Sequence, residues 1–123
     1  MIRTHDRRLF LPLSSGPYEW FASGRKNWEL RRYGRQYTKT HIVPGRIVEL
    51  RHGYGKSRDS LWGTIAGVQE AFGLDEFFSK VPFHDVIPVA ADRAEAIRIA
   101  DEILNLREDS HVHLIGFRIE LER

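Results

Sequence analysis

The sequence predicts an α+β fold in which a small mixed or antiparallel β-barrel carries flanking helices. Two observations predict it. The strand-like segments are mostly short, and the longest, 60–72, contains Gly63 and Gly67, which indicate the bends or bulges that a closing barrel needs. Helical segments are few, and the clearest one, which begins after Asp92, has an apolar stripe on one side.

The order of elements is expected to be β-α-β-β-β-α-α-β. Apolar and polar residues alternate in the strand segments, and Pro12 places the first strand at a sheet edge or end because proline lacks a backbone donor. Pro44 and Gly45 indicate a tight turn. The expected strands are 8–13, 27–32, 46–52, 60–72 and 113–121, and the expected helices are 18–23, 74–81 and about 93–106.

Helix ends are indicated by capping residues. Ser15 is the expected N-cap of the first helix, with Pro17 in its first turn, and Gly24 ends that helix in the left-handed conformation. Asp92 caps the last helix, and Glu95 three residues later completes a capping-box-like pair.

Composition restricts the class of protein. The 123 residues suit one domain, 1–123, and a hydrophobic fraction of 41% is ordinary for a folded chain. The absence of cysteine excludes disulfides and thiolate zinc sites and fits a cytoplasmic protein. No apolar run is long enough to cross a membrane and nothing at the start resembles a signal peptide, so we expect no membrane association.

Charge is divided unequally along the chain. Residues 1–62 hold 13 of the 19 Lys and Arg residues but only 5 of the 17 Asp and Glu residues. This basic half indicates an anionic partner, such as RNA or a nucleotide. The alternative is that the basic and acidic halves attract each other within one fold.

The stretch 24–31 concentrates three cations, a carboxylate and an indole where a short helix gives way to a strand. It has the pattern Gly24-x-Lys26-x-x-Glu29-x-Arg31. Because side chains alternate along a strand, Glu29 and Arg31 share one face, and Lys26 at the turn can reach the same space. Such a group can hold a phosphate and accept a hydrogen bond from a base. The alternative is a solvated strand with weak surface ion pairs.

This pattern resembles the Gly-x-Lys-x-x-Glu-x-Arg signature of the ASCH domain family, which is similar to PUA domains. The resemblance covers residues 9–121 and includes the preceding aromatic helix and the Pro-Gly turn that follows. It implies a PUA-like β-barrel and a cleft, formed partly by the motif, that binds RNA or a modified nucleoside.

Enzymatic activity is a second implication of the resemblance. Some similar proteins hydrolyse N4-acetylcytidine with the motif lysine, a threonine three residues later and a distant glutamate. Lys26 matches the lysine, but Glu29 occupies the threonine position. Asp85 is the first candidate for the distant carboxylate, and Glu70 and Glu76 are the second choices. Another reported type of activity in the family is ribonuclease, for which Lys26, Glu29, a tyrosine or a histidine are candidate acid–base groups, and no spacing in the sequence selects among them.

Basic and aromatic residues also alternate through the segment 25–58. Cations that follow a phosphate backbone and rings that stack on bases are typical of single-stranded nucleic-acid binding. Trp28 shares a face with Leu30, which favours a core position over a cleft position. The candidate nucleic-acid-binding residues are Lys26, Arg31, Arg32, Arg35, Tyr37, Arg51, Tyr54 and Lys56.

Other sites have weaker signals. His111 and His113 lack the accompanying ligands of a metal site, so we expect neither a metal nor another cofactor. The sequence therefore favours an RNA- or nucleotide-binding domain. A small hydrolase acting on a modified nucleoside or on RNA is one alternative, and an adaptor that binds a protein partner is another.

Overall fold

The computed structural model describes residues 7–53 and 59–122. The predicted order of elements is confirmed within these residues. The chain forms β1 (Leu9–Leu13), α1 (Ser15–Ala22), β2 (Trp28–Arg32), β3 (Ile47–His52), β4 (Ser60–Phe72), α2 (Leu74–Lys80), the short 3₁₀ helix η2 (Phe83–Asp85), α3 (Arg93–Leu104) and β5 (His113–Leu121).

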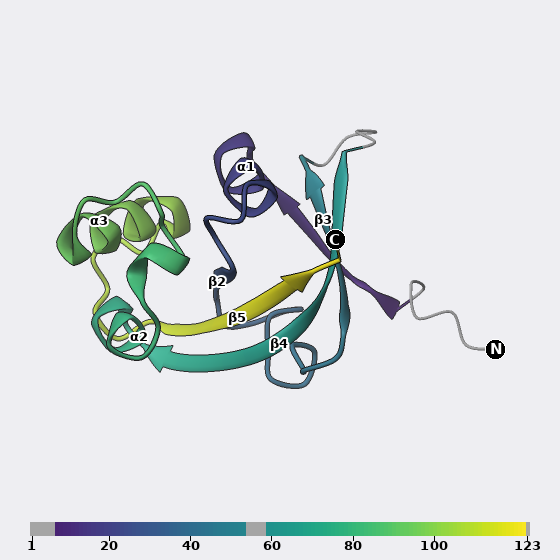
Figure 1. Ribbon diagram of the computed structural model, residues 1–123. Helices are drawn as coiled ribbons and strands as arrows, with labels where there is room; N and C mark the ends of the chain where they lie inside the picture. The colour runs from purple at the N-terminus through teal and green to yellow at the C-terminus, as the bar shows by residue number, and fades with distance from the viewer. Residues whose placement is uncertain (1–6, 54–58, 123) are drawn as a thin grey trace.

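The strands form one mixed sheet in the order β1-β3-β4-β5-β2. Only β1 and β3 are parallel; the other neighbours are antiparallel. The sheet curves into a half-barrel with β1 and β2 as its edges, while α2 and α3 gather at one end of the long strands β4 and β5 (Figure 1). The predicted bend in β4 is confirmed as a register shift between Ile65 and Gly67.

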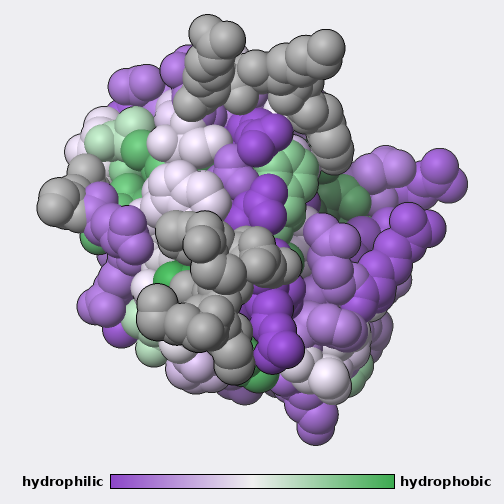
Figure 2. Space-filling view, turned by 90° about the vertical axis from the view of Figure 1, so that its right-hand side faces the viewer, coloured by the Kyte–Doolittle hydropathy of each residue, from purple (hydrophilic) through white to green (hydrophobic). Residues whose placement is uncertain are grey.

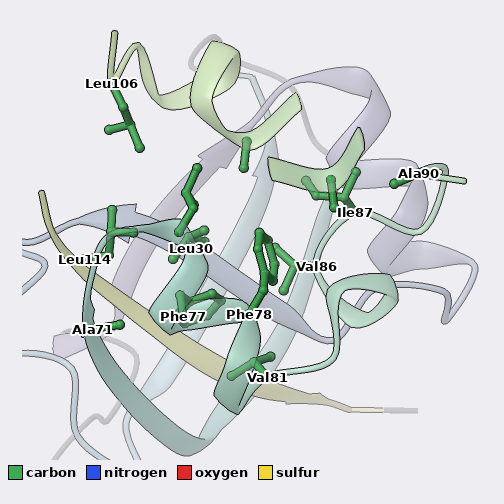
Figure 3. Close-up of a cluster of buried hydrophobic side chains, with 13 residues drawn as sticks. Leu30, Ala71, Phe77, Phe78, Val81, Val86, Ile87, Ala90, Leu106 and Leu114 are labelled. Carbon is green, nitrogen blue, oxygen red and sulfur yellow. The ribbon is translucent and has the colours of Figure 1, made fainter. Parts of the chain in front are cut away.

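Two apolar cores lie on the two sides of this sheet. The inner core, inside the curve, contains Leu11, Leu50 and Phe117, all fully buried. The other core, here called the helix-side core, packs α2 and α3 against the sheet and includes Leu30 and Phe77 (Figure 3). Trp28 is half-buried against the helix-side core, and its ring meets Phe77 edge-on with centroids 6.4 Å apart, which confirms the predicted core position.

Local signals set most helix ends. Asp92 accepts from the backbone N–H of Glu95 at 2.9 Å, as its capping position predicted. The first helix begins earlier than expected, because Ser14 occupies the N-cap and Ser15 is already helical. Gly24 has φ of 81°, in the left-handed region where glycine avoids a steric penalty, and it ends α1 as predicted.

The surface on the side of β1 and β3 is mostly hydrophilic, with smaller apolar patches between the polar side chains (Figure 2). Within the described residues, no helix combines the length and the apolar composition that crossing a membrane requires.

Candidate functional site

The turn after α1 determines where Lys26 lies. Once Gly24 has reversed the chain, the backbone N–H groups of Arg25 and Lys26 both donate to the carbonyl of Trp20 at 3.0 Å. Asn27 is then held between two elements, donating to the carbonyl of Asp85 at 3.0 Å and accepting from the N–H of Ile119 at 2.8 Å. The motif lysine is thus fixed by backbone bonds on both sides.

Glu29 and Arg31 lie on the concave face of the sheet. In the antiparallel register, Glu29 pairs with Phe117 and Arg31 with Ile115, and both partners belong to the inner core. Directly opposed residues of neighbouring strands point to the same side of a sheet. The two charged side chains therefore enter an apolar interior, which a solvated surface strand would not allow.

The three motif side chains form a buried chain of charges. Lys26 Nζ lies 3.4 Å from Glu29 Oε1, and Arg31 binds Glu29 Oε2 through Nε and Nη2, both at 2.7 Å. Lys26 is 5% exposed and Glu29 6% exposed. Ion pairs of this kind are expensive to bury unless hydrogen bonds satisfy the remaining polar atoms.

Backbone carbonyls and an aromatic side chain provide these hydrogen bonds. Lys26 Nζ donates to the carbonyl of Val86 at 2.7 Å. Val86 is itself fixed in the helix-side core (Figure 3). Arg31 donates to Tyr37 Oη at 3.1 Å and to the carbonyl of Pro12 at 3.3 Å, and its guanidinium lies over the Tyr37 ring. Among the described residues, no buried side-chain nitrogen or oxygen lacks a partner.

Burial and charge act on these groups in opposite ways. Burial lowers the pKa of Lys26 below its usual 10.5, the attraction of Glu29 offsets this only in part, and Arg31 lowers it further. Burial by itself would raise the pKa of Glu29, but the charges and hydrogen bonds of Arg31 and Lys26 outweigh it and hold that pKa below its usual 4.5.

A cavity of about 190 Å³ opens beside this chain of charges, in the gap between β1 and β2. We call it the inner cavity. Its walls come from β1, α1, β2, the segment after η2, and α3. It is lined by Pro12, Leu13, Ser14, Pro17, Trp20, Lys26, Glu29, Leu30, Arg31, Val86, Ile87, Ala100, Ile103 and Leu104.

A second hollow of about 560 Å³, here called the outer groove, adjoins the inner cavity. It is lined by Arg31, Arg32, Tyr33, Gly34, Arg35, Tyr37, Ile103 and Leu104. Arg31, Ile103 and Leu104 line both hollows, so the two meet at these residues.

The predicted nucleic-acid-binding residues fall into three groups. Lys26, Arg31, Arg32, Arg35 and Tyr37 gather around the inner cavity and the outer groove. Arg51 is on β3, outside both linings, and binds Glu49 at 2.7 Å. Tyr54 and Lys56 lie outside the described residues.

The candidate carboxylates other than Glu29 are placed differently. Asp85 reaches this region through its backbone carbonyl, and its side chain is not among those that line the inner cavity. Glu70 binds His113 at 2.9 Å, and Glu76 lies 4.0 Å from Lys80. The described residues contain no group of three or more His, Cys, Asp and Glu placed to bind a metal ion.

Some features of the site were not predicted from the sequence. The carbonyls of Val86 and Pro12 are backbone groups, which any residue type would supply. Tyr33 in the outer groove is not one of the candidate binding residues named from the sequence, although its position among Arg32 and Arg35 was a usable signal. Glu49 is a second buried carboxylate, 3% exposed, that the sequence did not single out.

Comparison with known proteins identifies the fold. No protein-family model and no curated protein sequence matches the chain. Hypothetical protein PH0355 has a similar structure, with a TM-score of 0.75 and 18% identity over 94% of this chain and 99% of that chain. PF0455 from Pyrococcus furiosus is similar too, with a TM-score of 0.66 and 17% identity over 93% of this chain and 96% of that chain.

A mutant of the ASCH protein from Zymomonas mobilis is also similar, with a TM-score of 0.63 and 10% identity over 93% of this chain and 69% of that chain. The half-barrel, its helices and these likenesses agree with the resemblance drawn from the motif at residues 24–31. The chain therefore has the fold of an ASCH domain, an α+β PUA-like barrel with flanking helices.

Proposed function

We propose that this domain binds RNA or a nucleotide, with a base or sugar of the ligand in the inner cavity. The observation that carries the proposal is the buried chain of Lys26, Glu29 and Arg31 in the wall of that cavity. Buried and electrostatically perturbed groups in a cleft are a common property of functional sites. The resemblance to ASCH domains supports the same class of ligand.

The chemistry of the cavity wall suits a polar ligand with negative charge. Two cations face one carboxylate, so positive charge is in excess. Two described acceptors, the Val86 carbonyl and Glu29, engage Lys26 Nζ, and an ammonium group has three hydrogens, so one remains for a ligand oxygen. The Glu29 carboxylate has further lone pairs that can accept from a base amino group.

The size of the cavity limits what it can hold. Its volume of about 190 Å³ lies below the roughly 300–1,000 Å³ of sites that enclose drug-sized molecules. A single planar group such as a base fits this scale better than a folded strand. Sequence-specific proteins often bind a base that is turned out of an RNA strand.

A filter-binding titration against single-stranded RNA at several salt concentrations tests the proposal. We expect affinity that falls as salt rises, because phosphate contacts release counterions. Lys26→Met should weaken binding by about tenfold or more, the scale of one hydrogen bond to a charged group. Lys80→Met is the matched control, because Lys80 is exposed and lies outside both hollows. Absence of salt-sensitive binding up to high micromolar RNA would contradict the proposal.

Hydrolysis of a modified nucleoside or of RNA is a second candidate function. The observation that favours it is the lowered pKa of Lys26, because a lysine closer to its neutral form is a better proton acceptor. Incubation with acetylated nucleosides and labelled RNA tests it. Product formed by the natural chain but not by the Lys26→Met variant would support catalysis. If no substrate is consumed, hydrolysis is wrong and ligand binding is the remaining function.

A further inference from the structure

Tyr33, which lines the outer groove, belongs to an aromatic stack that the proposed single-nucleotide site does not use. The ring of Tyr33 lies on the ring of His113, with centroids 3.9 Å apart and an interplanar angle of 9°. Phe72 stacks on His113 as well, at 4.5 Å and 17°. Tyr33 also lines the outer groove, so an aromatic group bound there would meet a ring that is already held in place.

The other tyrosine of the groove has a different environment. Tyr37 stacks on Phe117 with centroids 6.4 Å apart, and the Arg31 guanidinium lies over the same ring at 5.0 Å. Its hydroxyl accepts from Arg31 and from Gln36. Tyr37 is therefore occupied in supporting Arg31, and Tyr33 is the ring better placed to receive a base.

Two exposed cations flank Tyr33. Within the part of the chain that the structure describes, no carboxylate lies within ion-pair distance of Arg32 or Arg35. Arg35 sits in a tight turn in which Gly34 and Tyr37 exchange backbone hydrogen bonds of 3.0 and 2.8 Å. Its φ of 52° falls in the left-handed region that favours glycine.

From this arrangement we infer that the outer groove is a second nucleotide subsite. A base stacks on Tyr33, and Arg32 and Arg35 bind the phosphate that links it to the nucleotide in the inner cavity. The ligand class is therefore a single-stranded oligonucleotide of at least two nucleotides. This inference rests on the proposed function, since it places the neighbouring nucleotide in the inner cavity.

The two hollows are neighbours, which places the two proposed subsites side by side. They share Arg31 and the side of α3 at Ile103 and Leu104, so one strand that occupies both would pass over these three residues. Ile103 is 57% exposed at this shared rim, where it can contact the sugar between the two bases. A free nucleoside would leave the stack and the two arginines without a ligand.

Isothermal titration calorimetry with ligands of increasing length tests the inference. The probes are cytidine, cytidine 5′-monophosphate, the dinucleotide CpC and the tetranucleotide of cytidine, followed by the same series for the other three bases. One added stacked base should raise affinity roughly 5- to 150-fold from the monophosphate to the dinucleotide. Equal affinities of the monophosphate and the dinucleotide would assign Arg32 and Arg35 to a terminal phosphate and overturn the second base site.

Variants of Tyr33 separate the two subsites. Tyr33→Leu should remove most of the affinity that the dinucleotide gains over the monophosphate. Tyr33→Phe should keep that gain because the ring is retained. Tyr18→Leu is the matched control: Tyr18 is also a half-buried tyrosine stacked on a histidine, His52, but it lies outside both hollows. An equal effect of Tyr33→Leu on both ligands would overturn the inference.

Arg35→Gly tests the phosphate contact without straining the fold. Glycine accepts the positive φ, so the melting temperature should not fall, while dinucleotide affinity and its salt dependence should both decrease. Arg107→Gly removes the same charge at a φ of 54° on an exposed loop outside the groove and should leave binding unchanged.

The outcomes distinguish the second subsite from the proposed function. If the monophosphate binds as tightly as the dinucleotide, the second subsite is wrong while the proposed function stands. If no nucleotide of any length binds, the proposed function and the second subsite both fail.

Discussion

Arg31 on β2 donates to the backbone carbonyl of Pro12 on β1 across the open side of the half-barrel, at 3.3 Å. The two strands are the edges of the sheet and do not pair with each other. One side chain therefore bridges a gap that a closed barrel would fill with a backbone ladder. The inner cavity occupies this gap, so the missing strand pairing is what creates room for a ligand.

The buried charge chain should be sensitive to neutralisation of its centre. Glu29→Gln keeps the shape but leaves Lys26 as a buried cation without its counter-charge, so we expect a loss of about 3 kcal/mol in the free energy of unfolding. Urea denaturation at pH 7 measures this value. A change below about 0.5 kcal/mol would show that the three residues are not coupled as the distances indicate.

Coupling between Lys26 and Glu29 can be measured directly. In a double-mutant cycle with Lys26→Met, the double variant should be less destabilised than the sum of the single variants, because both charges of the pair are removed together. Additive losses within about 0.3–0.5 kcal/mol would argue against a direct interaction across the 3.4 Å between Nζ and Oε1.

Lys26 should lose its proton at a lower pH than an ordinary lysine. Its pKa is below 10.5 because burial disfavours the ammonium form. Between this lowered pKa and 10.5, the unfolded state binds more protons at Lys26 than the folded state does. The free energy of unfolding therefore rises with pH across that interval. NMR titration of the lysine Cε signals measures the shift, with the exposed Lys39 and Lys80 as references in the same spectra. Titration of Lys26 together with these two would contradict the buried environment.

Acid should remove stability through Glu49. This carboxyl is 3% exposed, and although burial opposes ionisation, hydrogen bonds from Ser60, Arg51 and Arg8 lower its pKa to about 2. Because the folded pKa lies below the unfolded value of 4.5, the stabilisation is complete above pH 4.5 and is lost as the pH falls toward 2. It amounts to at most about 3 kcal/mol.

Denaturation curves between pH 2 and pH 6 measure this loss. Glu49→Gln should flatten the dependence of stability on pH in that range. Glu120→Gln, on an exposed strand position whose ion pair with Arg118 is solvated, should leave it unchanged. Glu29 has a lowered pKa too, so part of the acid dependence should remain in the Glu49 variant.

Gly116 on β5 should not tolerate a side chain. A Cβ there would clash with two ring atoms of Phe77, which is fully buried, and Gly116 pairs with Leu30 of β2. Gly116→Ala should therefore cost about 1–3 kcal/mol through overpacking. Gly67→Ala is the control, because its Cβ would meet neighbours only at ordinary contact distances of 3.7–3.8 Å. Thermal denaturation of the two variants checks the contrast.

Much of the fold was predictable from local patterns. Alternation fixed the bounds of β4 and β5, the Asp92–Glu95 pair fixed the start of α3, and Gly24 fixed the end of α1. These signals act over a few residues, where backbone geometry and capping bonds decide the conformation. The predicted start of α1 was wrong because Ser14 and Ser15 are adjacent and both are suitable N-cap residues, and Ser14 is the one that occupies the cap.

The candidate site was predictable only in part. The sequence by itself determined that Glu29 and Arg31 share a strand face and that Lys26 precedes them at a turn, because side chains alternate along β2. Only the tertiary structure decided that this face is the concave, buried one, through pairing with Phe117 and Ile115. It also brought the carbonyls of Pro12 and Val86 to the charges, since contacts between residues distant in sequence depend on strand order and core packing rather than on local pattern.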